Sequence, residues 1–308
     1  MLRERTVVSV AGVRKTYGKT VAVDDVSFEV RDGEIFGLIG PNGAGKTTTM
    51  ECVEGIRKPD RGVITVLGLD PFRDVYQLQE RIGVQLQQAH LQKRIKVWEA
   101  VHLWASLYNK PISHGDRLLE QLGLAEKRNA WFMTLSGGQQ QRLFIALALI
   151  NDPEVVFLDE LTTGLDPQAR RAIWELVRGI RARGKTVFLT THLMEEAERL
   201  CDRVAVIEHG RIIDVDTPQR LVDKYCPDRS VVLTTDDVRA EERFRALAQV
   251  VGVTRDGNQF TIHGRGDGFI TAVIQGLAEH QVRVSEFRTE QPSLEDVFLK
   301  LTGHSIRD

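Results

Sequence analysis

Cysteine is scarce in this sequence, with only Cys52, Cys201 and Cys226 among 308 residues. The three are far apart, odd in number and in no spacing typical of metal ligands, so the sequence indicates neither a disulfide framework nor a cysteine metal site. The pattern predicts reduced thiols in a cytoplasm.

Long apolar runs are absent as well. No uninterrupted stretch approaches the roughly 18 residues that a membrane-spanning helix needs. Residues 1–5, Met-Leu-Arg-Glu-Arg, lack the apolar region of a signal peptide. If this protein works at a membrane, we therefore expect another chain to supply the spanning part.

Neither sign of charge is in excess. Lys and Arg number 41 against 43 Asp and Glu, a net charge of −2. This balance gives no electrostatic footprint for DNA or RNA, so we expect no nucleic-acid partner. A content of 42% hydrophobic and 27% charged residues is that of a soluble globular protein, and the length suggests about two domains.

A glycine-rich loop carries the first chemical motif. It fits the pattern G-x-x-x-x-G-K-[ST], and its residues are Gly40, Pro41, Asn42, Gly43, Ala44, Gly45, Lys46 and Thr47. An apolar run at residues 35–39 predicts a buried strand before it, and a helix is expected from Thr47 to about Gly55. This strand–loop–helix order favours a phosphate-binding loop over a plain turn.

The loop predicts contacts with a nucleoside triphosphate. Its glycines let backbone N–H groups approach phosphate oxygens, and the helix N-terminus favours an anion. Lys46 should reach the β- and γ-phosphates, and the Thr47 hydroxyl should bind Mg²⁺. Thr48 follows in the same turn and is included in the predicted ATP site.

An acidic pair follows a second apolar strand, predicted at residues 155–158. Asp159 and Glu160 then lie at the carboxyl end of a parallel strand, where α/β folds bind ligands. Asp159 is predicted to hold Mg²⁺ directly or through water, and Glu160 to polarise the water that attacks the γ-phosphate. Without the phosphate-binding loop, the pair would be only the solvated end of a strand.

The remaining pattern predicts two domains. Residues 6–35 suggest short strands of a mixed sheet, residues 60–87 strands and turns, and residues 88–150 helices. A helix at 167–183, a strand at 186–190, a hairpin at 204–215 and a helix from 218 complete a domain of residues 1–225. In residues 226–308 the order β-α-β-β-α-β, ending in a strand at 282–287 and a helix at 293–301, predicts a small ferredoxin-like α+β domain.

A second motif lies at residues 135–139, hereafter the signature segment, Leu135-Ser136-Gly137-Gly138-Gln139. Ser136 is placed to cap a helix, and the glycines allow an anion to approach the free N–H groups. With the glycine loop, this segment makes residues 6–222 resemble the nucleotide-binding subunit of an ATP-binding cassette (ABC) transporter. The resemblance implies a P-loop NTPase fold: a RecA-like core, an antiparallel β subdomain and a helical signature subdomain.

The resemblance implies further roles. Tyr17 matches the aromatic residue that stacks on adenine, and His192 matches the switch histidine at the γ-phosphate. Gln87 matches the glutamine that touches the metal and senses the membrane partner, although Gln85 and Gln88 are close alternatives. Asp166 belongs to the D-loop along the dimer seam. Leu161 departs from the family, which usually has Pro there, and this should alter loop stiffness rather than chemistry.

The same resemblance predicts the assembly. In the family, Ser136, Gly137, Gly138 and Gln139 of one subunit close over the ATP held by the other. We therefore expect ATP and Mg²⁺ as cofactors and a head-to-tail homodimer of this chain. The C-terminal residues 292–303 resemble ATP-binding subunits of ABC-2-type exporters, including the daunorubicin-resistance-like group. That implies efflux of a drug or lipophilic compound through a separate permease, with this chain peripheral on the cytoplasmic face of the inner membrane.

Two other functions share the cassette motifs. A soluble ABC ATPase acting on ribosomes or nucleic acid is disfavoured, because about 90 positions between Lys46 and Ser136 leave no room for a long coiled-coil insertion and only one cassette is present. An importer ATPase with a regulatory C-terminal domain has the same catalytic residues. It differs only beyond residue 226.

Overall fold

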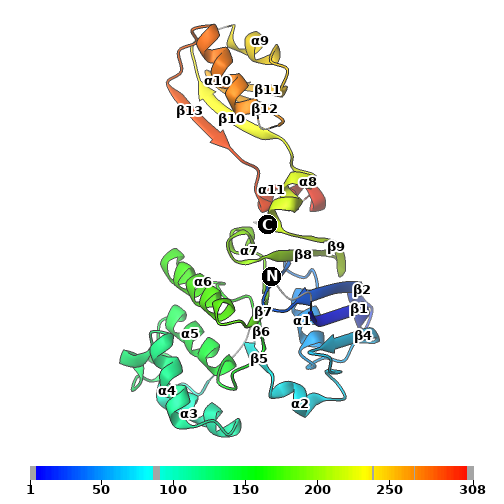
Figure 1. The fold of residues 1–308 in the computed structure, drawn as a ribbon, viewed down its shortest axis with the longest axis vertical. Helices are drawn as coiled ribbons and strands as arrows, with labels where there is room; N and C mark the ends of the chain where they lie inside the picture. Colours follow the sequence, from blue (N-terminus) through cyan, green and yellow to red (C-terminus); the bar gives the residue numbers. More distant parts are fainter. Residues whose placement is uncertain (1–4, 86–90, 238, 267, 304–308) are drawn as a thin grey trace. The chain divides into compact units, whose positions relative to one another are not determined.

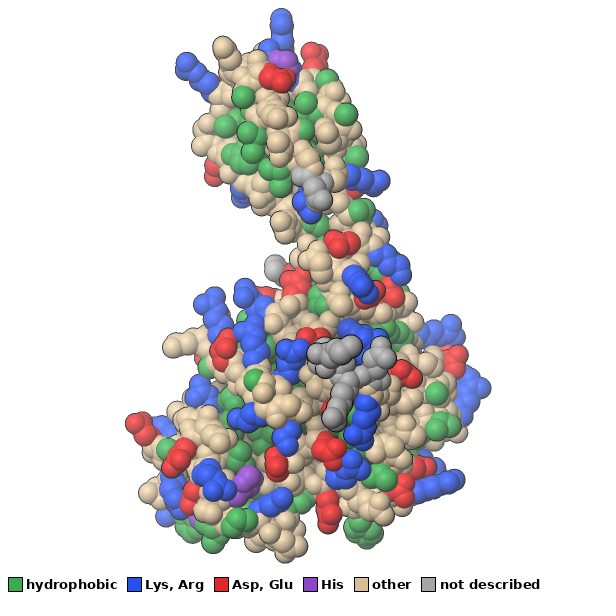
Figure 2. Space-filling view, in the orientation of Figure 1, with side chains coloured by type: hydrophobic (Ala, Val, Ile, Leu, Met, Phe, Trp, Pro, Cys, Tyr) green, Lys and Arg blue, Asp and Glu red, His purple; other side chains and the backbone are tan. Residues whose placement is uncertain are grey.

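The computed structural model describes residues 5–85, 91–237, 239–266 and 268–303. The chain divides into two compact units, Met1–Pro218 and Gln219–Asp308, each with its own sheets and helices (Figure 1). On the face of the first unit in Figure 2, Lys and Arg side chains are interspersed with Asp and Glu rather than gathered by sign.

A six-stranded sheet forms the centre of the first unit. Its order is β5 (Ile82–Gln85), β6 (Val155–Asp159), β7 (Thr186–Thr191), β3 (Ile35–Ile39), β8 (Arg203–Glu208) and β9 (Arg211–Asp216). All neighbouring pairs are parallel except β8 and β9. Every residue of β3, β6 and β7 is buried, which explains their continuous apolar runs. Because these three strands are parallel, their carboxyl ends meet at one edge of the sheet.

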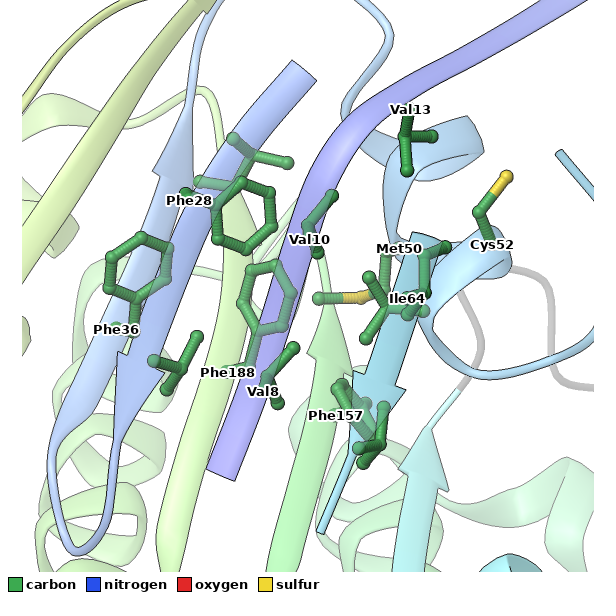
Figure 3. Packing of buried hydrophobic residues seen from close by; sticks show 14 of the residues in the cluster. Val8, Val10, Val13, Phe28, Phe36, Met50, Cys52, Ile64, Phe157 and Phe188 are labelled. Carbon is green, nitrogen blue, oxygen red and sulfur yellow. The ribbon is translucent and has the colours of Figure 1, made fainter. Parts of the chain in front are cut away.

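A second sheet of the first unit is antiparallel, with the order β2 (Thr20–Arg31), β1 (Thr6–Tyr17) and β4 (Arg61–Val66). Its first two strands are longer than the short strands expected, and they form no mixed sheet, because residues 6–31 make one continuous hairpin. Phe28 of β2 stacks on Phe36 of β3 at a ring-centroid distance of 5.4 Å and meets Phe188 of β7 edge to face (Figure 3). The aromatic core therefore joins the two sheets.

Seven α-helices complete the described part of the first unit. They are α1 (Lys46–Val53), α2 (Val75–Gln79), α3 (Val97–Leu107), α4 (Ile112–Gln121), α5 (Gly137–Ala148), α6 (Pro167–Ala182) and α7 (Met194–Leu200). Helices α3 to α5, with two 3-10 turns at Ala125–Lys127 and Phe132–Thr134, form the helical region predicted for residues 88–150. Helix α2 was not predicted, because its five residues are too few to show a helical period.

The second unit has the predicted ferredoxin-like order. Its elements are α8 (Pro218–Tyr225), β10 (Arg229–Thr234), α9 (Ala240–Arg245), β11 (Val250–Asp256), β12 (Gln259–Gly264), α10 (Phe269–Glu279), β13 (Glu286–Glu290) and α11 (Leu294–Thr302). The antiparallel sheet runs β11-β12-β10-β13 around a core that includes Phe244, Phe260 and Phe269.

Two predicted bounds differ from the structure. The last strand begins at Glu286, not residue 282, because Val282 packs against the core and its N–H donates to Leu277 O at the end of α10. The division at Pro218 precedes the boundary expected after Tyr225. Helix α8 falls mostly within the second unit, where Lys300 Nζ donates to Tyr225 O at 2.7 Å.

Candidate functional site

The glycine loop joins β3 to α1, as predicted. Gly43 and Gly45 have φ of 79° and 101°, in the left-handed region that favours glycine. A Cβ on Gly45 would lie 2.3 Å from Ala22 O, and one on Gly40 would lie 2.2 Å from Ile207 O. Helix α1 begins without a side-chain cap, so its first N–H groups face the loop with no competing acceptor from its cap residue. These features form an anion-binding helix N-terminus.

Lys46 is enclosed by the loop it follows. Its side chain is 4% exposed, and Nζ donates to Gly40 O at 3.0 Å and Pro41 O at 2.9 Å. Nζ also lies 3.6 Å from Glu160 Oε1. Burial lowers the pKa of Lys46, while the Glu160 and Asp159 carboxylates oppose that shift. The ammonium is thus held where a phosphate entering the loop would meet it.

Asp159 and Glu160 end β6, as predicted, but their environments differ. Asp159 is buried and accepts a hydrogen bond from the Thr190 hydroxyl on β7. Burial raises the pKa of Asp159, and bonds from the Thr190 and Thr47 hydroxyls partly oppose the rise. Glu160 has φ of 47°, and its N–H donates to Thr190 O at 3.2 Å. This unusual backbone turns its carboxylate toward Lys46 instead of along the strand.

His192 directly follows β7 and faces the same carboxylate. Its Nδ1 lies 3.5 Å from Glu160 Oε1, in a contact that is not a hydrogen bond. Nδ1 is buried and has no hydrogen-bond partner among the residues that the structure describes. Since buried ring nitrogens are normally satisfied, this atom is suited to an incoming polar group.

A cavity of about 510 Å³ gathers most of the predicted ATP-site residues. It is lined by Ala22, Asn42, Gly43, Gly45, Lys46, Thr47, Thr48, Glu160, Thr163 and His192. Four other predicted residues belong to the loop or to β6 but do not line the cavity: Gly40, Pro41, Ala44 and Asp159. Ala22 and Thr163 were not predicted, because neither belongs to a recognised motif. Only the folding of the chain brings them to the cavity.

Tyr17 is a predicted site residue that does not line this cavity. It is 41% exposed at the end of β1, with the Arg57 guanidinium carbon 5.2 Å from its ring centroid. Gln87 lies outside the described residues, as does its alternative Gln88. The other alternative, Gln85, is buried at the end of β5.

The signature segment lies elsewhere in the first unit. Ser136 caps α5, accepting from the Gln139 N–H at 3.4 Å while its own N–H donates to Gln139 Oε1 at 3.0 Å. A Cβ on Gly138 would lie 3.1 Å from Ala169 Cβ at the start of α6. Asp166 caps that helix by accepting from the N–H groups of Gln168 and Ala169. No residue of the signature segment lines the 510 Å³ cavity.

Comparison with known proteins identifies the family. Residues 23–163 match the family described as ABC transporter, and residues 220–302 match the C-terminal domain of DrrA1-3-like ATP-binding proteins. The chain is 40% identical to the Nod factor export ATP-binding protein I of Ralstonia nicotianae, over 98% of this chain and 95% of that protein. This chain belongs to the ABC transporter ATPases.

Other ABC proteins support the same assignment. The linearmycin resistance ATP-binding protein LnrL of Bacillus subtilis is 34% identical over 96% of this chain and 98% of its own length. A bacterial ABC transporter cassette solved as a dimer covers 68% of this chain and 98% of its own, with a TM-score of 0.61 and 26% identity. The predicted family and fold are thereby confirmed. As an ABC subunit, the chain is an ATPase that binds nucleotide, in a family whose ATP-binding subunits dimerise and work with transmembrane partners.

Proposed function

We propose that this chain hydrolyses ATP to drive export through a separate ABC-2-type permease. The observation that carries the proposal is the meeting of Lys46, Glu160 and His192 at one cavity on the glycine loop. Relatives named for export and for resistance match nearly the whole chain, including the small C-terminal unit. None of the described helices is long and apolar enough to span a bilayer.

In this proposal the loop binds the phosphates. Its backbone N–H groups and the Lys46 ammonium take the β- and γ-phosphate oxygens, and the phosphates replace the loop carbonyls that Lys46 now contacts. The residues fit Mg²⁺, which prefers one or two carboxylates together with hydroxyls, waters and phosphates. Thr47 and Asp159 would hold the ion, with Gln87 added on the family resemblance. When bound, Mg²⁺ would neutralise charge that develops on the phosphates.

Glu160 and His192 would then act on the terminal phosphate. Lys46, which lies 3.6 Å from the Glu160 carboxylate, would turn to the phosphate, and the carboxylate would orient the attacking water. His192 presents a buried Nδ1 without a hydrogen-bond partner in the described chain, so it is suited to contact a γ-phosphate oxygen. Tyr17 would stack on adenine and order that end of the nucleotide.

The signature segment acts, in this proposal, on the ATP of a second copy of the chain. Its glycines lie against the start of α6 and away from the glycine-loop cavity of the same chain. A head-to-tail homodimer would bring Ser136 to Gln139 onto the partner's nucleotide and place the loop containing Asp166 along the seam. ATP would draw the cassettes together, and hydrolysis would release them.

The permease would dock on a second cavity of the first unit, hereafter the groove, of about 540 Å³. It is lined by Glu54, Ile56, Gln79, Ile82, Gly83, Val84, Gln85, Leu91, Trp104, Tyr108, Phe144, Leu147, Ala148 and Asn151. The groove thus joins the end of β5 to α3 and α5. Two of its lining residues, Gln85 and Leu91, flank Gln87 in the sequence.

A transport assay tests the proposal. An ABC-2-type permease that copurifies with this chain is reconstituted with it in liposomes, and ATP added outside should drive a lipophilic dye into the lumen, as for an exporter with its cassettes outward. Dye extrusion would favour the importer reading. A pull-down of this chain from solubilised native membranes tests the soluble-ATPase alternative, which recovery of ribosomes or DNA with no integral membrane protein would favour. The face visible in Figure 2 has mixed charges and no stripe of Lys and Arg that would bind nucleic acid.

A further inference from the structure

Glu54 is a buried acid that ATP hydrolysis does not use. It is the C-cap residue of helix α1, is 7% exposed and lines the groove. Its Oε1 is sealed from solvent and makes no hydrogen bond within the described chain. Burial raises the pKa of Glu54 to about 9, and the negative charges of Asp159 and Glu51 act in the same direction. An unsatisfied carboxyl in such a place is costly unless a partner arrives.

The groove around Glu54 is otherwise mostly apolar. Ile82 and Val84 of β5 face Trp104 of α3 and Phe144 and Leu147 of α5 as its lining residues. The neighbouring acid Glu51 already pairs with Arg57 at 2.6 Å, whereas Glu54 has no such cation beside it in the described structure. The groove therefore combines apolar walls with one buried acid whose Oε1 has no hydrogen-bond partner among the described residues.

We propose that the groove receives an apolar segment of the permease carrying one Lys or Arg, whose charged head pairs with Glu54. This rests on the proposed function and specifies the partner's chemistry. A long basic side chain suits the site because its methylene stem packs on apolar walls while its head reaches an acid. The charges of Asp159 and Glu51 that act on Glu54 are both negative, so the site favours a cation, whereas an acidic partner would be repelled.

The position of Glu54 also ties docking to the nucleotide. Helix α1 begins at Lys46, which contacts the phosphates in the proposed mechanism, and Glu54 is the C-cap residue at its other end. A rigid element of this length carries displacement from one end to the other. Pairing at Glu54 would therefore hold the permease segment against the helix that responds to ATP.

The experiment uses the full chain in membranes that contain its permease. A photoreactive amino acid replaces Ile56, a groove residue that is 54% exposed, and the crosslinked permease peptide is identified by mass spectrometry. We expect an apolar segment with one Lys or Arg. Glu54→Lys should lower ATP-driven transport at least tenfold, and replacing the identified basic residue by Glu should restore most of it. Glu54→Gln, which keeps the side-chain shape, should give a smaller loss.

Controls separate this inference from the function on which it rests. Glu120→Gln, at an exposed position on α4 outside the groove lining, should leave transport near the wild-type value. Thermal unfolding of each variant identifies folding defects, and Glu54→Gln provides the result if Glu54→Lys does not fold. Wild-type transport by both Glu54 variants, or a crosslinked segment with no basic residue, would overturn the inference while wild-type export stands. Absence of transport by the wild type would instead overturn the proposed function.

Discussion

Glu160 has a backbone conformation that residues with a Cβ rarely adopt, at the end of an otherwise regular strand. Its N–H is held by the neighbouring strand through Thr190, so the bend is fixed by the sheet itself. The carboxylate consequently lies beside both Lys46 and His192. Such preorganisation is the usual reason for strain at a functional site.

Glu160→Gln tests the role of that carboxylate. The amide keeps the side-chain shape but removes the charge that orients water, so ATP should still bind while hydrolysis falls about 10²–10⁴-fold. The ATP-bound dimer should accumulate, which size-exclusion chromatography with ATP and Mg²⁺ would detect. Glu195→Gln, at a half-exposed position on α7, is the matched control. Hydrolysis at the wild-type rate would show that another group orients the water.

Lys46→Ala should have a different effect at the same cavity. It removes the ammonium that meets the phosphates, so tight ATP binding itself should be lost. Equilibrium titration with a fluorescent ATP analogue measures this directly. The assignment of Lys46 fails if affinity stays at the wild-type value in a variant with normal thermal unfolding.

Tyr17 allows a smaller, graded prediction. Tyr17→Ala should weaken ATP affinity by about 0.5–1.5 kcal/mol, the value of an aromatic stacking contact, and leave saturated turnover near normal. Tyr76→Ala is the control, because that ring is 87% exposed on α2. A large fall in kcat with unchanged KM would mean that Tyr17 is not the adenine platform.

At the scale of elements, Glu196 links three segments around the site. Its buried Oε1 accepts from the Thr162 hydroxyl and from Trp174 Nε1, both at 2.9 Å. Thr162 follows the acidic pair of β6, Trp174 belongs to α6, and Glu196 itself lies on α7 just beyond His192. One carboxylate oxygen therefore fixes the loops that carry Glu160 and His192 relative to each other.

Glu196→Ala should destabilise the first unit by about 2–5 kcal/mol, because it leaves two buried donors without an acceptor. Urea unfolding followed by tryptophan fluorescence measures the change. Glu195→Ala is the neighbouring control: its exposed pair with Arg199 at 3.0 Å should contribute less than about 1 kcal/mol. Equal effects of the two substitutions would exclude the bridging role.

The sequence predicted those elements whose own residues carry a recognisable motif. A capping box formed by Ser136 and Gln139 marks the start of α5. The glycine loop is recognisable in the sequence because its backbone conformation requires glycine. Thr190 was missed because its contact with Asp159 depends on the register of β6 beside β7, which pairs residues 31 positions apart. Leu103 and Leu107 fit the helical period of α3 yet are exposed, since periodicity alone does not say which face is covered.

At the scale of the whole molecule, the two units have separate cores. Phe28, Phe36 and Phe188 belong to the core of the first, and Phe244 and Phe260 to that of the second. The second unit also exposes apolar side chains at Ile274 of α10 and Phe287 of β13. The sequence predicted a boundary after Tyr225, whereas the structure divides after Pro218, before most of helix α8.

The separation of cores predicts the effect of removing the second unit. All residues lining the nucleotide cavity belong to the first unit, so a chain ending at residue 218 should fold and bind ATP with nearly the full-length affinity. Titration with a fluorescent ATP analogue, beside thermal unfolding of both forms, tests this. If the second unit supports the dimer, the shortened Glu160→Gln chain should form less ATP-bound dimer than the full-length Glu160→Gln chain at equal concentration. Loss of ATP binding by a truncated chain that still unfolds cooperatively would show that the second unit contributes directly to the nucleotide site.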